Sequence, residues 1–551
     1  MTDRTPAPPA DVCIVGAGPA GAMLAASLAD RGHDVVVLEA GPRFDRGERG
    51  RRMERALRPD HDDDIWEMGG ERDRFTTSGP VDYGLNAARV KGVGGTTLHW
   101  GAMTPRLHPE DFEMATRYGV GADWPISYAD LEPYYLRAER AMGVAGAASP
   151  FGGARSGPHP MAPVPPSYSD GLLAEGFDAE GIALHPVPRA INTAQYDGRS
   201  ECVGYGTCDP VCPSGAKYDA TVHVRKAAES GARVVDRAPV QRLEHDADGE
   251  RVVAAEYATP DGETHRQEAR CFVVACGAVE SVRLLLLSRS PQYPDGLANE
   301  SGELGHYFME HPGVRVRGRL EEPTRQHLIG YSTSMSEQYY AYDRGPEGTI
   351  ILECSNTAGR QPVETALEQL PLSGRLLRGD VAAAFERDRW GERHLERVAD
   401  EATRHVSINA WVEQLPDRDN RVSLDRSRTD DRGNPVPEVA FDVDERTRAA
   451  LERAEAVCRD VLAAVGATDL RTNPESGAPF WTAHHQMGVT RMGSDPDASV
   501  LDPTLRTHDL SNLYVSSSGA FPTSGAANPT LTIAALTLRL ADHLDGRLGS
   551  A

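Results

Sequence analysis

The stretch of residues 11–41, DVCIVGAGPAGAMLAASLADRGHDVVVLEAG, constrains the fold more than any other part of the chain. The apolar run at 12–15 predicts a buried parallel strand. An alanine-rich helix pattern and a second apolar run follow, and the latter ends at Glu39. Between the first run and the helix stands a G-x-G-x-x-G pattern, formed by Gly16, Gly18 and Gly21. This order is typical of a βαβ unit that binds a dinucleotide.

Each residue of the pattern has a physical task. Gly16 allows the tight turn, Gly18 lets a pyrophosphate approach the backbone, and Gly21 lets the helix pack on the strand. The helix N-terminus offers free N–H groups to the phosphates. Glu39, followed by Ala40, can accept hydrogen bonds from an adenosine ribose. The pattern alone does not separate FAD from NAD, and a purely structural glycine turn is the alternative interpretation.

Length and charge bound the class of protein. A chain of 551 residues exceeds what one hydrophobic core usually serves, which predicts two domains. The net charge of −24 argues against nucleic acid as a partner, because it would repel the phosphates. Nearly all positive charge is arginine, since the chain has three lysines, and the acid excess with scarce lysine favours a halophilic protein. A GC-rich genome, which favours Arg codons, is the alternative explanation.

The N-terminal sequence and the hydropathy pattern bear on localisation. No run of about 20 apolar residues is present, so no membrane span is predicted. The first ten residues lack the basic and apolar regions of a signal peptide. We therefore expect a cytoplasmic protein, or one exported or held at a membrane through a partner subunit that carries its own signal.

Further segments are predicted to surround the same cofactor. The sequence VKGVGGTTLHWG supplies a second glycine-rich loop, and the strand meander at 232–275 ends in another βα turn. The C-terminal loop at 516–529 is rich in small residues that could wrap a flat ring system. The cofactor-binding residues predicted from these segments are Gly94, Gly95, Thr96, His99, Val240, Ala275, Gly277, Ser517, Ser518, Asn528, Pro529 and Thr530.

Residues 311–480 have a different pattern of predicted secondary structure. Extended patterns at 314–320, 349–353 and 406–413 predict an antiparallel sheet, and helices are expected at 370–377 and 445–465. A strand-like stretch also lies at 181–190. Because cofactor-like sequence resumes after residue 480, this region is predicted to be an inserted domain. The predicted fold class is α/β.

Four motifs in order resemble the glucose–methanol–choline (GMC) oxidoreductases: VGAGPAGAMLA with Glu39, VGGTTLHWG, ACGAVESVRLLLLS and the C-terminal H-x-x-G…NPTLTIAAL block. The resemblance implies FAD and a bipartite fold. It places the FAD domain at 1–115, 200–310 and 485–551. The substrate domain and connections occupy 116–199 and 311–484, and a cysteine loop lies at 200–218.

The resemblance also implies the chemistry. Members oxidise an alcohol by hydride transfer to flavin N5 while a histidine takes the hydroxyl proton. By motif position that base is His485, with His484 as its rival, and the amide of Asn528 is its partner. Some relatives bond the flavin to a histidine in a motif like TLHW, which leaves a covalent bond at His99 open. Ser517 stands where other members carry Asp, so the chain departs from the family pattern at this position.

Cys202, Cys208 and Cys212 form a C-x5-C-x3-C pattern that ends in Cys-Pro. Three thiolates on a glycine-rich loop suit an iron–sulfur cluster. The spacing resembles that of FAD-dependent sugar and gluconate dehydrogenase large subunits, which implies a [3Fe–4S] centre. A zinc site with His223 as fourth ligand, and plain thiols, are the alternatives.

A cluster would imply a dehydrogenase of a sugar, sugar acid or polyol whose electrons leave to a cytochrome or quinone-linked acceptor. The resemblance further suggests a small chaperone-like partner subunit. Two other functions stay open at this point: an oxygen-using alcohol or sugar oxidase with inert cysteines, and a non-catalytic flavin electron-transfer subunit.

Overall fold

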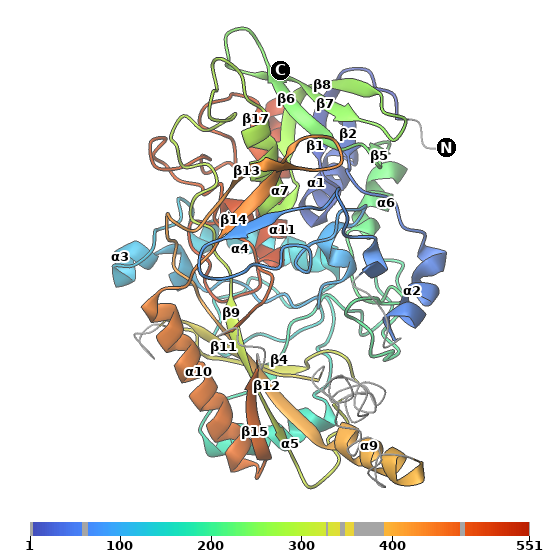
Figure 1. Ribbon diagram of the computed structural model, residues 1–551, viewed down its shortest axis with the longest axis vertical. Coiled ribbons are helices and arrows are strands. Elements are labelled where there is room, and N and C mark those ends of the chain that lie inside the picture. The colour runs from blue at the N-terminus through green and yellow to red at the C-terminus, as the bar shows by residue number, and fades with distance from the viewer. Residues whose placement is uncertain are drawn as a thin grey trace, which may run out of the picture.

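The computed structural model describes residues 4–57, 64–326, 329–341, 348–356, 391–473 and 480–549. A mainly parallel seven-stranded sheet lies towards one end of the long axis and an antiparallel seven-stranded sheet towards the other, with a small third sheet between them (Figure 1). This arrangement confirms the predicted α/β class with a dinucleotide-type sheet and a second, antiparallel sheet domain.

The first sheet has the order β5-β2-β1-β8-β7-β6, and β17 pairs with β8. Its strands are β1 Ala10–Val15, β2 Val35–Leu38, β5 Arg233–Val235, β6 Val240–His245, β7 Val252–Ala258, β8 Thr264–Val274 and β17 Leu513–Val515. The first part of β8 is antiparallel to β7, residues 269–274 run parallel to β1, and the last three residues pair with β17. The meander and the buried parallel core therefore share one long strand.

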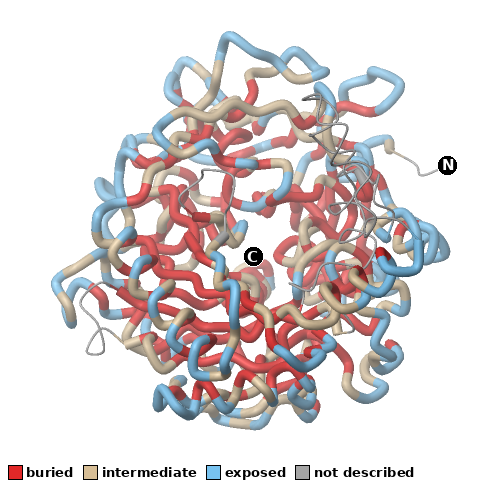
Figure 2. Tube along the Cα trace, turned by 60° about the horizontal axis from the view of Figure 1, so that its bottom comes forward, coloured by how far each residue is buried: buried red, intermediate tan, exposed pale blue. Residues whose placement is uncertain are grey.

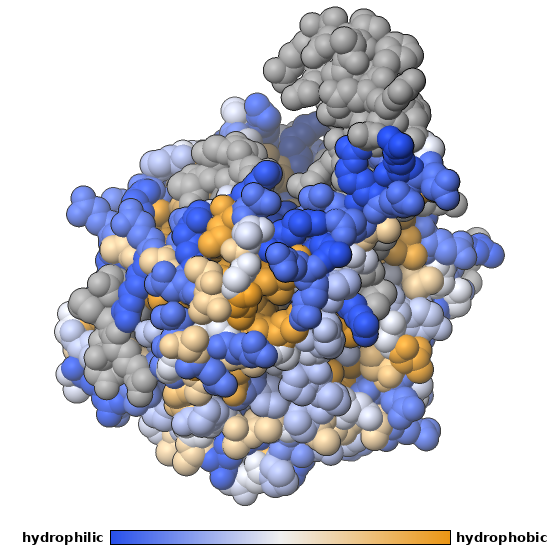
Figure 3. Space-filling view, turned by 90° about the horizontal axis from the view of Figure 1, so that it is seen from below, coloured by the Kyte–Doolittle hydropathy of each residue, from blue (hydrophilic) through white to orange (hydrophobic). Residues whose placement is uncertain are grey.

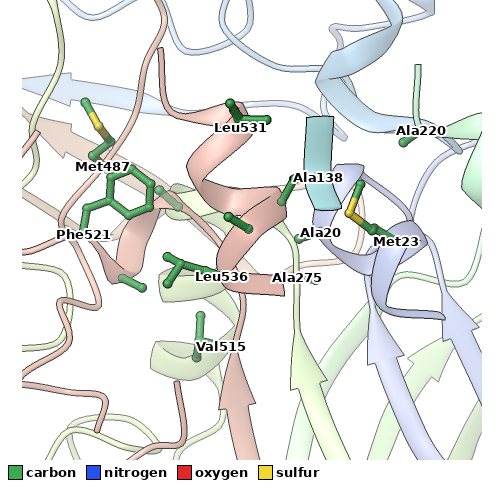
Figure 4. Close-up of a cluster of buried hydrophobic side chains, with 14 of the residues drawn as sticks. Ala20, Met23, Ala138, Ala220, Ala275, Met487, Val515, Phe521, Leu531 and Leu536 are labelled. Atoms are coloured by element: carbon green, nitrogen blue, oxygen red, sulfur yellow. The ribbon is translucent and has the colours of Figure 1, made fainter. Parts of the chain in front are cut away.

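Helices cover this parallel core. They are α1 Pro19–Ala29, α4 Tyr128–Met142, α6 Thr221–Glu229, α7 Gly277–Leu287 and α11 Thr530–Gly549. α1 packs against α6 and α11, and α11 packs against α4. Figure 4 shows the side chains that meet there, from Met23 of α1 and Ala138 of α4 to Leu531 and Leu536 of α11. Alanines on α1 and α4 leave room for the close approach of their neighbours.

The second sheet has the order β15-β9-β12-β11-β10-β4, and β16 pairs with β9. Its strands are β4 His185–Pro186, β9 Pro312–Arg319, β10 Ser334–Tyr339, β11 Ile350–Cys354, β12 His405–Val412, β15 Thr468–Asn473 and β16 Trp481–Thr482. The three predicted strands of this region are confirmed. The strand-like stretch at 181–190 contributes only the two residues of β4, and the helix predicted at 370–377 lies outside the described residues.

Three helices belong to this end of the molecule: α5 Tyr168–Ala179, α9 Glu392–Arg404 and α10 Glu445–Ala464. α10 packs on β9 and β12 and against α5. It buries Ala450, Ala454, Cys458 and Val461, a spacing of three to four residues that puts one face of the helix on the sheet. The helix predicted at 445–465 is thus confirmed.

The third sheet joins distant parts of the chain. It consists of β3 Thr76–Ser78, β13 Arg421–Thr429 and β14 Pro435–Ala440, and β14 runs parallel to β3. The two short helices α2 Arg49–Ala56 and α3 Met114–Tyr118 complete the described helices longer than one turn. The β13–β14 hairpin therefore pairs with a strand from the predicted FAD domain, although the predicted boundaries had put it in the substrate domain.

Buried segments run through both large sheets and the helices that pack on them (Figure 2). Seen from the antiparallel-sheet end, the surface is largely hydrophilic with an apolar area near its centre (Figure 3). Among the described helices, none has an apolar stretch long enough to cross a bilayer.

Candidate active site

A cavity of about 520 Å³ extends from the β1–α1 turn to the C-terminal segments at 483–486 and 528–530. Most of the predicted cofactor residues line it: Gly16, Gly18, Glu39, Ala40, Gly95, Thr96, His99, Val240, Ala275, Gly277, Ser517, Ser518, Asn528, Pro529 and Thr530. Gly21 and Gly94 do not line it. A side chain at Gly21 would collide with the carbonyl oxygen of Gly16, and the N–H of Gly94 donates to the carbonyl of Ala17. These two glycines shape the walls of the cavity.

The β1–α1 turn has the geometry of a phosphate cradle. Gly18 is the N-cap of α1, and no side chain caps this helix end. A Cβ added at Gly18 would meet only the Cα of Gly95, 4.0 Å away, so the space beyond Gly18 is open. The free N–H groups of the first helical turn can donate to an anion placed there.

Glu39 lies at the same end of the cavity and is buried. Its two carboxylate oxygens accept hydrogen bonds from the backbone N–H groups of Ala17 (2.8 Å) and Gly41 (2.9 Å). Burial raises the pKa of this carboxyl group, and the two backbone donors oppose the shift. Each oxygen keeps a second lone pair, so Glu39 still has acceptor capacity for a ribose.

An ionic cluster beside Glu39 was missed by the sequence analysis. Glu280 at the start of α7 pairs with Lys91 (3.1 Å) and with Arg89, and Arg283 pairs with Asp430 at 2.6 Å. The neighbouring cations hold the pKa of Glu280 well below its usual range despite its burial. All five of these residues line the cavity. In the sequence, the signal that could have pointed to the cluster was Lys91, because the chain has only three lysines.

A β-bulge places the residues at the end of the cavity that lies away from the β1–α1 turn. Thr482 pairs with Pro312, and Met487 pairs with Met309. Between these two pairs, one strand advances five residues, from 482 to 487, while its partner advances only three, from 312 to 309. The two extra residues must leave the ladder, and His484 takes a left-handed φ of 61° within the bulge. The bulge turns 484–486 into the cavity, which all three of these residues line.

His485 is held from both sides. Its Nδ1 lies 2.9 Å from Nδ1 of His311, and its Nε2 lies 3.1 Å from Nδ2 of Asn528. Burial is the main cause that holds the pKa of His485 well below its ordinary value. The imidazole is thus neutral at neutral pH and can accept a proton. The structure brings together the predicted pair His485 and Asn528.

His311 and the preceding Glu310 were not predicted. Glu310 is buried, accepts from the Tyr83 hydroxyl at 2.5 Å, and accepts from the backbone N–H groups of His311 and His485. Desolvation raises the pKa of this carboxyl group to about 7. The signal available in the sequence was a histidine between an acid and a proline, immediately before β9.

His99 also lines the cavity, and burial lowers its pKa to about 3, so its imidazole is neutral. His484 is exposed to the cavity that it lines. The protein atoms around the cavity still remove part of the water near this ring, and this desolvation lowers its pKa as well. Three neutral imidazoles, His99, His484 and His485, are therefore grouped at this end of the cavity.

The cysteine loop lies beside the cavity. Asp209, next to Cys208, lines it, and the buried Lys217 donates from Nζ to the carbonyls of Trp100 (2.7 Å) and Cys208 (2.5 Å). Burial raises the pKa of the Cys208 thiol to about 12, and the charge of Lys217 opposes the shift. Lys217 thereby ties the loop to the segment that carries His99.

The thiols do not form a ready metal site. Within the described part of the chain, no group of three or more His, Cys, Asp or Glu side chains is placed to hold a metal ion. Cys202 Sγ lies 4.0 Å from the Tyr331 hydroxyl, and Cys212 Sγ accepts from the N–H of Lys217 at 3.5 Å. The donor chemistry suits an iron–sulfur cluster, but the arrangement of the side chains does not show one.

Comparison with known proteins identifies the family. The GMC oxidoreductase profiles match residues 83–313 and 416–537, and an FAD-dependent oxidoreductase profile matches residues 11–75. The chain is 35% identical to a fructose dehydrogenase large subunit from Gluconobacter japonicus over 97% of each chain. The chain belongs to the GMC oxidoreductase family. It is an FAD-dependent oxidoreductase that acts on CH–OH donors.

Two further likenesses extend this comparison. The GMC oxidoreductase is 30% identical to a paromamine 6'-oxidase from Streptomyces fradiae, over 98% of this chain and 92% of the relative. Its fold matches a crystal structure of a pyridoxine 4-oxidase from Mesorbium loti with a TM-score of 0.63 at 19% identity, covering 97% and 99% of the two chains.

The cavity fits FAD on its own features. The open space at Gly18 can take the pyrophosphate, and Glu39 offers acceptors at the adenosine end. At the far end, the Oδ1 atom of Asn528 is buried without a hydrogen-bond partner in the described structure, which is typical of a group that meets a ligand.

The glycines of the β1–α1 turn give the first testable prediction. Gly18→Ala should keep the melting temperature within error and lower the affinity for FAD at least about tenfold, because the methyl group occupies the space of the pyrophosphate. Gly21→Ala should instead destabilise the fold by about 1–3 kcal/mol, because its Cβ would lie 2.0 Å from the Gly16 carbonyl oxygen.

Gly171→Ala on α5, where an added Cβ meets nothing within 4 Å, is the control. Fluorescence titration of the apoprotein with FAD and calorimetry of all three variants separate the two effects. Equal FAD affinity in Gly18→Ala and the parent protein would contradict the placement of the pyrophosphate.

Proposed function

We propose that this GMC oxidoreductase is a dehydrogenase that oxidises a CH–OH group of a sugar, sugar acid or polyol. The observation that carries the proposal is the pair formed by His485 Nε2 and Asn528 Nδ2, 3.1 Å apart at the end of the cavity. A single hydroxyl oxygen between them would meet one proton acceptor and one hydrogen-bond donor.

The chain's own residues supply acid–base chemistry and positioning. His485 takes the hydroxyl proton on Nε2, since its low pKa keeps the ring neutral with one nitrogen free to accept, and Nε2 is the nitrogen that faces Asn528. The amide of Asn528 donates to the oxygen as negative charge develops, and it has no proton to lose. Bound FAD supplies the other half of the reaction by accepting the hydride from the carbinol carbon, and a carbonyl compound is the product.

The dehydrogenase assignment is supported by the similarity to a fructose dehydrogenase large subunit. The likeness to a paromamine oxidase favours the second candidate, an oxidase that passes electrons to oxygen. The two candidates differ in a simple way. An oxidase forms hydrogen peroxide under air without an added acceptor, whereas a dehydrogenase needs a dye or protein acceptor for turnover.

We further propose that Cys202, Cys208 and Cys212 bind a [3Fe–4S] cluster in the loaded protein. The spacing of the cysteines supports this, as do the two buried cations near Cys208, Lys217 and Arg189, which would offset the charge of thiolate ligands. The zinc and plain-thiol alternatives predict protein without iron or acid-labile sulfide.

The same comparison supports proposals about the partner subunits and the localisation of this chain. The relative's name makes it one subunit of a larger enzyme, so we propose a small partner subunit and a cytochrome or other acceptor for this chain too. We propose that the chain is cytoplasmic, or is exported or held at a membrane through such a partner. The charge of −24 supports a protein adapted to high salt.

His485→Ala should lower the rate of anaerobic flavin bleaching by about 10²–10⁴-fold with a ketose, an aldose, an aldonic acid and a polyol alike. Asn528→Ala should slow the same step without altering the flavin spectrum of the resting enzyme. His394→Ala, a buried histidine of α9 outside the cavity, is the matched control and should react normally. Unchanged bleaching in His485→Ala would refute the base assignment.

Iron and sulfide analysis tests the cysteine loop. Purified protein should contain about three iron atoms per chain, and Cys208→Ser should lose them while keeping its flavin. The Cys458→Ser variant, a buried cysteine of α10 remote from the loop in sequence, should retain the iron. Full flavin content with no iron in the parent protein, expressed with iron supplied, would rule out the cluster.

Salt dependence tests the halophilic assignment. Because screening relieves the repulsion between excess carboxylates, the melting temperature should rise by several degrees between about 0.1 M and about 2 M KCl. A chain whose arginine content merely reflects genome composition should show no such rise, and calorimetry at the two salt concentrations distinguishes these cases.

A further inference from the structure

The segment that carries Asn528 also holds a second histidine against the base. His311 Nε2 lies 2.9 Å from the carbonyl oxygen of Gly525, and His311 Nδ1 lies 2.9 Å from Nδ1 of His485. The two rings meet edge to face, with centroids 5.0 Å apart. His311 is fully buried, and it contacts the base on the side away from Asn528.

The hydrogen bonds admit one assignment of protons for two neutral rings. A carbonyl oxygen can only accept, so Nε2 of His311 must carry its proton. Nδ1 of a neutral His311 is then an acceptor, and the proton between the rings must belong to Nδ1 of His485. Nε2 of His485 then carries no proton, and its lone pair accepts from the amide of Asn528.

We propose that His311 is a positioning residue that fixes the tautomer and the ring orientation of His485, so that Nε2 of the base faces the hydroxyl to be oxidised. This rests on the proposed function, because it presumes that His485 is the base. When Nε2 gains the hydroxyl proton, the Nδ1–H bond to His311 also stabilises the new positive charge.

Surrounding groups support this role. Burial lowers the pKa of His311 to about 4, so the ring is neutral in the working range and can accept from His485. The buried carboxyl group of Glu310 accepts from the backbone N–H of both histidines, which fixes the two backbones relative to each other. His311 has no other ring nitrogen to offer a substrate, since both of its nitrogens are engaged.

The turn at 525–527 is itself fixed by the second sheet domain. The Tyr340 hydroxyl accepts from the N–H groups of Ala526 (3.0 Å) and Ala527 (3.1 Å), and the Trp411 indole donates to the Ala526 carbonyl (2.8 Å). The acceptor for His311 and the backbone that carries Asn528 are therefore one rigid unit. Movement of this turn would disturb both contacts of the base at once.

Two variants separate the chemical role from packing. His311→Gln keeps an acceptor that can face His485 Nδ1–H and a donor that can face the Gly525 carbonyl, whereas His311→Leu removes both at similar volume. With the substrate that bleaches the flavin fastest, His311→Leu should lower kcat by about 10–100-fold with little change in KM. His311→Gln should restore kcat to within a few-fold of the parent enzyme.

The pH profile and the tautomer are readouts that packing would not move. Loss of the acceptor should shift the acid limb of kcat/KM to lower pH in His311→Leu, because the protonated base loses its partner. Long-range ¹H–¹⁵N spectra of histidine-labelled protein should show the Nδ1–H tautomer for His485 in the parent and a mixture in His311→Leu.

Three outcomes decide the matter. Parent-like kcat, pH profile and tautomer in a flavin-loaded His311→Leu variant would overturn the proposal, and so would a His311→Gln variant as impaired as His311→Leu. His485→Ala, measured in the same series, keeps the two claims apart. If it is inactive while His311→Leu is normal, only the positioning role falls; if it is fully active, the base assignment falls.

Discussion

The active end of this molecule depends on one irregularity in a β-ladder. The segment that enters as β16 pairs with the start of β9, leaves the ladder for residues 484–486, and rejoins it at Met487. A regular ladder would alternate these side chains between the two faces of the sheet. The bulge instead delivers two adjacent histidines to the cavity, and the Ser518 hydroxyl donates to the Gln486 carbonyl at 2.5 Å to hold it.

The same ladder explains how two domains can share one site. β9 belongs to the antiparallel sheet, whereas the chain after Met487 leads to β17 and α11 of the parallel sheet. Residues that line the cavity come from the parallel sheet, from the turn of the β13–β14 hairpin and from the bulged segment 483–486 that connects the two large sheets. A fixed connection between the two sheets suits a reaction in which the proton acceptor, the hydrogen-bond donor and the hydride acceptor must be aligned at the same time.

Much of the fold and part of the candidate site could be predicted from the sequence. The βαβ unit has a local signature, because turn, phosphate approach and helix packing each demand glycine at a fixed position. The strands β9, β11 and β12 were predicted from their apolar patterns, and His485 with Asn528 from family motifs. The contacts at Gly525 and Tyr340 are different: they join residues 214 and 186 positions apart, and nothing in local sequence encodes such pairing.

His311 and the cluster around Glu280 show the same limit. A buried histidine and a buried carboxylate look alike in sequence whether they stabilise a core or orient a base, since only the partners distinguish these roles. The cysteine loop is the converse case. Its spacing suggested a metal site, while the described side chains show a loop tied to the cavity by Lys217 without an assembled ligand set.

The most direct test of this account is a crystal structure of the FAD-loaded protein with a slow substrate or carbonyl product bound. We predict that the oxygen of the reacting group lies about 2.6–3.2 Å from both His485 Nε2 and Asn528 Nδ2, with residues 484–486 still bulged. An oxygen held by other side chains, or a regular ladder in place of the bulge, would contradict it.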